Sequence, residues 1–87
     1  MKDLLEKYME RISSWQSQVK SGEINKSADF PEDELKEMMS FFSNRESPLN
    51  RIHANLDSML DNRDITEIEA HLEDCWVILN NALKQYK

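Results

Sequence analysis

The last quarter of the chain, from Ile65 to Tyr86, carries the strongest hydrophobic pattern in the sequence. Its apolar residues recur at steps of three and four, the spacing that places side chains along one face of a helix. These residues are Ile65, Ile68, Leu72, Cys75, Leu79, Ala82 and Tyr86. A helix with such a face must bury it against other elements, so the stretch predicts a bundle for which the upstream chain supplies the partners.

The composition agrees with a helical fold. The chain of 87 residues contains one glycine and two prolines, whereas a sheet-rich fold normally needs many of both in its turns. Leu, Met, Glu and Lys, which favour helices, are abundant. A chain of this length is sufficient for one small domain, so we expect a single helical-bundle domain over residues 1–87.

The hydrophobic pattern divides the chain into four segments. The predicted fold is all-α: a small antiparallel bundle of three or four helices over about 2–21, 30–44, 48–61 and 64–86. Gly22 is the expected C-terminal cap of the first helix. We expect Asp29 and Asp64 to cap the second and the last helix, each with a glutamate three residues later.

Pro48 decides whether the middle pair forms two helices or one kinked helix. The helical register from Leu35 to Met59 runs through Pro48 without interruption, which favours one helix. A proline inside a helix, however, costs about 3 kcal/mol. A single rod over 31–61 would also measure about 46 Å, against about 30 Å for the first helix. We therefore predict two helices, with one helix kinked at Pro48 as the alternative.

The charge balance limits the classes of partner. Seventeen acidic and eleven basic residues give a formal net charge of −6, which disfavours direct binding to nucleic acid. No apolar run is long enough to cross a membrane, and the charged first residues do not resemble a signal peptide. A single cysteine is typical of a reducing compartment. We expect a cytoplasmic protein that does not bind membranes.

The residues with ligand or catalytic chemistry are few. Glu67, His71 and Cys75 follow one another at four-residue steps, and His53 and Asp57 have the same spacing, which is compatible with metal ligation. Cys75, however, lies on the hydrophobic stripe, where a free cysteine is usually packing material. The chain also has no glycine-rich phosphate loop or nucleophilic triad. We predict no metal, no cofactor and no enzymatic activity.

Two groups of residues, one apolar and one acidic, exceed what the helix core requires and are candidates for partner binding. The apolar candidates for partner binding are Met38, Met39, Phe41, Trp76 and Val77. The acidic candidates are Glu32, Asp33, Glu34, Glu37, Glu69, Glu73 and Asp74. The alternatives are core filling for the apolar group and an ordinary solvated surface for the acidic group.

These observations predict a small acidic regulator or inhibitor that binds another protein through a helix face. Immunity proteins, antitoxins, phage-encoded inhibitors and adaptors are proteins of this type. An acidic surface would steer association with a basic partner. The alternative is a structural homodimer in which the last helices pair across a two-fold axis, and an acidic mimic of DNA is a lesser alternative.

Overall fold

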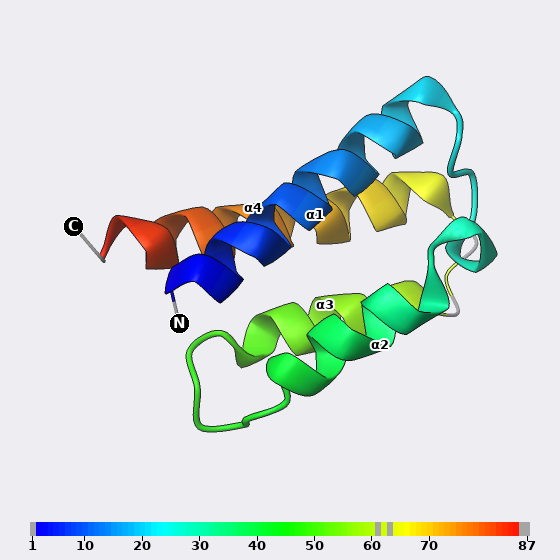
Figure 1. The fold of residues 1–87 in the computed structure, drawn as a ribbon. Helices are drawn as coiled ribbons and strands as arrows, with labels where there is room; N and C mark the ends of the chain where they lie inside the picture. The colour runs from blue at the N-terminus through cyan, green and yellow to red at the C-terminus, as the bar shows by residue number, and fades with distance from the viewer. Residues whose placement is uncertain (1, 61, 63, 86–87) are drawn as a thin grey trace.

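The computed structural model describes residues 2–60, 62 and 64–85, and within these residues the protein is all-helical (Figure 1). The element order is α1 (Lys2–Ser21), a 3₁₀ helix η1 (Ser27–Asp29), α2 (Glu32–Phe41), α3 (Asn50–Leu60) and α4 (Ile65–Lys84). The predicted helical bundle is therefore confirmed, in its four-helix form. None of the described helices has both the length and the hydropathy needed to span a membrane.

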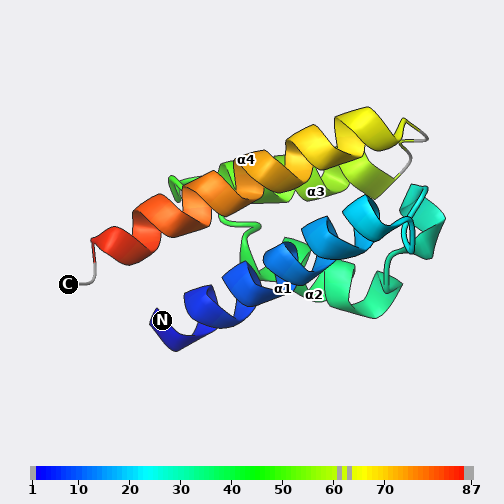
Figure 2. The same ribbon diagram turned by 90° about the horizontal axis from the view of Figure 1, so that it is seen from above.

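The helices form two antiparallel pairs of unequal length. α1 and α4 have 20 residues each and lie side by side, whereas α2 and α3 have 10 and 11 residues (Figure 1). Seen from above, α4 lies over α3 and α1 over α2 (Figure 2). α4 packs against both α1 and α3, which makes it the central helix of the bundle.

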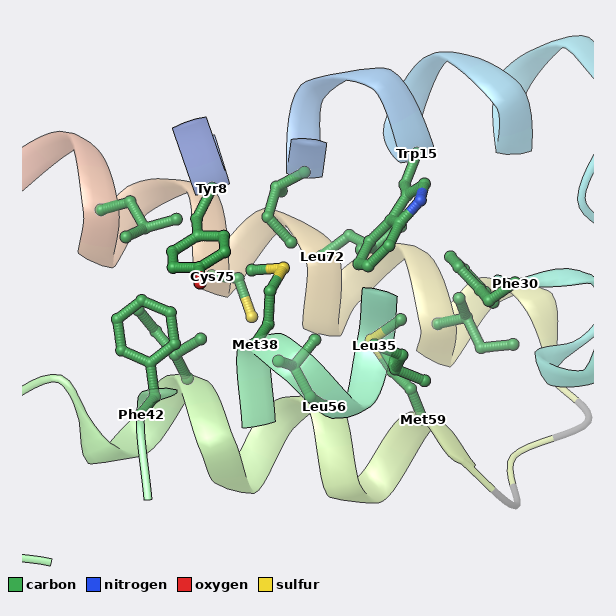
Figure 3. Packing of buried hydrophobic residues seen from close by; sticks show 14 of the residues in the cluster. Tyr8, Trp15, Phe30, Leu35, Met38, Phe42, Leu56, Met59, Leu72 and Cys75 are labelled. Carbon is green, nitrogen blue, oxygen red and sulfur yellow. The ribbon is translucent and has the colours of Figure 1, made fainter. Parts of the chain in front are cut away.

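The core lies between the two pairs and receives side chains from all four helices (Figure 3). α1 buries an apolar stripe at steps of three and four residues, and α4 contributes a matching stripe. The buried residues of these two helices are Leu5, Tyr8, Ile12, Trp15, Val19, Ile68, Leu72, Cys75 and Leu79. The shorter helices close the core from the other side, mainly through Leu35, Met38, Ile52, Leu56 and Met59.

The helical structure is interrupted around Pro48, which excludes the single kinked helix. α2 ends at Phe41 and α3 begins at Asn50, so both helices are shorter at this connection than predicted. The Asn50 side-chain amide donates to the Phe42 carbonyl at 3.1 Å, and the Ser47 hydroxyl accepts from the Leu49 N–H at 3.1 Å. These bonds satisfy the backbone of a turn, in agreement with the exclusion of proline from helix interiors.

The helix caps match the sequence in part. Gly22 adopts φ +86, the left-handed conformation expected after α1. The Asp64 carboxylate accepts from the Thr66 N–H at 2.9 Å, so the predicted cap of α4 is confirmed. The predicted cap at Asp29 is wrong. Its carboxylate accepts instead from the Asn25 N–H at 3.0 Å, and Pro31 precedes α2.

Two predicted helix ends, at 61 and 86, lie outside the described residues; α3 is described to Leu60 and α4 to Lys84.

Candidate protein-binding surface

The apolar candidates on α2 belong largely to the core. Met38 is completely buried, so no docked partner reaches it in this conformation (Figure 3). Phe41 is half-buried, and the centroid of its ring lies 5.1 Å from that of Tyr8 and 4.9 Å from that of Phe42. Met39 is also half-buried against the core cluster. Core filling therefore accounts for most of the apolar surface that this segment carries.

Glu37, an acidic candidate on α2, is neutralised within the molecule. Its carboxylate lies 3.1 Å from the Arg11 guanidinium and 3.5 Å from the Lys7 ammonium, both on α1. The hydrogen bond from Arg11 is the main reason that the pKa of Glu37 lies below its usual value. Arg11 also donates to the Glu34 carbonyl, at 3.3 Å. These contacts hold α2 against α1 and compensate the charge of Glu37.

The first turn of α2 carries three further acidic candidates. Glu32 pairs with Lys36 at 2.8 Å, and the hydrogen bond between them lowers the pKa of the Glu32 carboxyl. Asp33 and Glu34 have exposed side chains in the same turn. Carboxylates at this place are stabilised by the helix dipole. The first turn of α2 therefore has a structural reason to be acidic that requires no partner.

Asp74, on the flank of α4 that faces α3, belongs to a polar network. Its carboxylate accepts from the Asn55 amide at 2.6 Å and pairs with Arg51 at 2.9 Å. Since the amide nitrogen of Asn55 donates to Asp74, its oxygen is free to accept from Nδ1–H of His71, at 2.9 Å. Asn55 is only 9 % exposed, and the network connects α3 to α4 at this point.

Cys75 lies beside this network with its thiol buried. Burial, reinforced by the negative charge of Asp74, raises the pKa of the thiol to about 12. A thiol with so high a pKa is not ionised at neutral pH and is a poor nucleophile. His71 and Glu67 have other partners, Asn55 and Asn62 respectively. No cluster of three potential metal ligands occurs in residues 2–60, 62 and 64–85.

The opposite flank of α4 forms a groove with α1. The groove has a volume of about 500 Å³, and we refer to it as the α1–α4 groove. Its lining residues are Gln16, Lys20, Thr66, Glu69, Ala70, Leu72, Glu73 and Trp76. Three of the predicted candidates thus meet at one site, although the wall that α1 supplies was not anticipated. The signal for it was the polar edge of α1 next to its buried stripe.

The α1–α4 groove contains two carboxylates, those of Glu69 and Glu73. Glu69 and Glu73 are exposed, and neither forms a salt bridge within the described part of the chain. Lys20 lines the same groove without pairing with them at salt-bridge distance. Like charges four residues apart on a helix repel each other by about 0.2–0.5 kcal/mol. This flank therefore keeps its negative charge at a cost to helix stability.

Apolar side chains border these carboxylates. Trp76 is half-buried in the groove, and Val77, one residue further along α4, is 42 % exposed. We refer to the exposed residues Glu69, Ala70, Glu73 and Val77 as the outer face of α4. Acidic and apolar groups are therefore adjacent at this place, whereas on α2 the apolar groups are mostly buried and two of the four carboxylates are paired.

A second groove lies at the other end of the bundle, where the short helices do not cover the long ones. It has a volume of about 580 Å³ and is bounded by Leu5, Pro48, Leu49, Ile78 and Ala82, with polar residues at Ser47, Asn81 and Gln85. No charged side chain lines it among the described residues.

Comparison with known proteins gives no assignment: no family model matches the chain, and no curated protein or solved structure is significantly similar to it.

Proposed function

We propose that this chain is a small protein-binding regulator or inhibitor that acts through the outer face of α4 and the adjoining α1–α4 groove. The observation that supports this proposal is the distribution of neutralised charge. Glu37 and Asp74 are paired with basic side chains of other helices, whereas Glu69 and Glu73 are exposed and form no salt bridge with any residue that the structure describes. Uncompensated carboxylates beside Trp76 are suited to a basic partner.

The physical role of these charges is to accelerate association. A protein of net charge −6 attracts a basic surface from a distance, and the attraction is screened at a Debye length of about 8 Å in physiological salt. The contacts of Trp76 and Val77 then contribute the apolar part of the interface. Binding to such a partner weakens as salt is added, because the steering term is the most sensitive to screening.

A quantitative pull-down from the native host tests this proposal. The double variant Glu69→Lys/Glu73→Lys should lose the partner, and the wild type should lose it progressively as salt is raised. The matched control is Asp33→Lys/Glu34→Lys, which makes the same charge change on α2 and should retain the partner. Loss of the partner with the control variant alone would place the interface on α2 and contradict the proposal.

A homodimer is the second candidate, and the exposure of Val77 on the outer face of α4 favours it. Antiparallel pairing of two copies of α4 about Val77 would bring Glu69 of one copy towards Lys84 of the other, which gives opposite charges. Sedimentation over a concentration series distinguishes the candidates. A dimer that Val77→Glu dissociates supports this alternative, and a monomer throughout the series eliminates it.

A further inference from the structure

We infer that the α1–α4 groove binds an arginine side chain of the partner protein. This inference rests on the proposed function and adds the chemistry of the group that is bound. It starts from the arrangement of the two acidic residues. Glu69 and Glu73 are one helical turn apart and line the same groove, so their carboxylates can approach one cation together.

No basic side chain among the described residues forms a salt bridge with these two carboxylates. Lys20 lies in the opposite wall, on α1, but forms no salt bridge with Glu69 or Glu73. On the other flank of α4, by contrast, Arg51 reaches Asp74 at 2.9 Å. Among the described residues, Glu69 and Glu73 thus have no paired cation of the kind that Asp74 has on the other flank.

Trp76 makes the groove more selective than a pair of carboxylates alone. Its side chain is half-buried and lines the groove together with Glu69 and Glu73. A guanidinium group stacks on aromatic rings and forms two parallel hydrogen bonds with a carboxylate. An ammonium group is more strongly hydrated and cannot make the paired contact. An aromatic side chain beside two carboxylates therefore favours arginine over lysine.

The volume and the charge distinguish this groove from the second one. At about 500 Å³ the α1–α4 groove lies within the range of sites that accept small groups, roughly 300–1,000 Å³. The second groove is of similar volume, but no charged side chain lines it among the described residues, so it offers nothing for a cation to pair with. Charge complementarity thus assigns the basic group to the groove between α1 and α4.

A titration followed by two-dimensional ¹H–¹⁵N NMR tests the inference. The probe is a helical alanine-based peptide with two arginines four residues apart, compared with peptides that carry lysine or the uncharged isostere citrulline instead. The indole N–H signal of Trp76 should shift saturably with the arginine peptide. That of Trp15, which is 2 % exposed, should remain in place and serve as an internal control. The lysine peptide should bind several-fold more weakly, and citrulline should leave the Trp76 signal unshifted.

Two variants make the test specific. Glu69→Gln/Glu73→Gln should raise the Kd of the arginine peptide about tenfold or more, since the charge-assisted hydrogen bonds are lost. The control Glu10→Gln/Asp57→Asn removes the same charge at exposed sites of α1 and α3 and should leave the Kd within about twofold.

The inference is overturned if Trp76 does not respond, if citrulline binds as well as arginine, or if the glutamine variant binds normally. In those cases, a partner that is still lost with Glu69→Lys/Glu73→Lys would leave the proposed function standing.

Discussion

Both flanks of α4 carry acidic residues, but the two flanks differ in whether these residues form ion pairs with other described residues. On the flank against α3, Asp74 is held by Arg51 and Asn55, and Asn55 in turn accepts from His71. On the flank against α1, Glu69 and Glu73 line a groove without a paired cation in the described part of the protein. We refer to the flank of α4 that carries Asp74 as the satisfied flank, because its carboxylate is paired with Arg51 and Asn55.

This difference shows that a count of acidic residues is a poor guide to a binding surface. What distinguishes the carboxylates is whether the fold supplies a counter-charge. When a carboxylate forms an ion pair within the molecule, a cation of the partner must compete with that pair to bind it. An unpaired carboxylate is available without such competition. The comparison can be tested by substitutions on each side of α4.

The largest effect is expected where α4 faces the core. Leu72→Ala should lower the free energy of unfolding by about 2–5 kcal/mol, because Leu72 is completely buried and a cavity would remain. Val77→Ala, on the outer face, should change it by no more than about 0.5 kcal/mol. Urea unfolding of both variants measures the difference. Equal losses would mean that the two residues are not on opposite sides of the helix.

A smaller effect is expected from the satisfied flank. Asn55→Ala should lower the free energy of unfolding by about 1–3 kcal/mol, since both Asp74 and His71 lose their bond to its amide. Glu73→Gln, on the opposite flank, should change stability by at most about 0.5 kcal/mol. The same urea experiment compares the two. A harmless Asn55→Ala would show that the network does not connect α3 to α4.

The pH dependence of stability tests how well the satisfied flank excludes water. The thiol of Cys75 has a pKa of about 12 in the fold against 9.0 ordinarily, so above pH 9 the thiolate forms more readily in the unfolded chain and stability falls. Between about pH 8 and about pH 10, the wild type should lose about 1.4 kcal/mol relative to Cys75→Ala. Parallel pH profiles for the two proteins would show that the thiol is accessible to water.

Much of the fold could be predicted because it depends on local spacing. The stripes of α1 and α4 follow from steps of three and four residues, and the α1 residues at these steps, from Leu5 to Val19, are buried. The cap at Asp64 is local as well. The cap at Asp29 was mispredicted, because Asn25 offered its carboxylate a competing local bond.

The charge pairing, in contrast, could not be predicted from spacing. Arg11 and Glu37 are 26 residues apart, and Asn55 and Asp74 are 19 apart. Such pairs depend on how the helices pack, which the heptad pattern does not specify. One signal was nevertheless present in the sequence: Asn55 stands beside Leu56 in the buried register of α3, and a polar residue at such a place needs a partner.

The short helix α2 and the long helix α4 are also expected to differ in how easily they open. α2 buries only Leu35 and Met38 and packs mainly against α3, whereas α4 is held from two sides. Segments with few buried contacts open at a lower free energy than the rest of a domain. Amide protons of α2 should therefore exchange with solvent before those of α4. The surface that we assign to the partner thus lies on a helix that is expected to open at a higher free energy than α2.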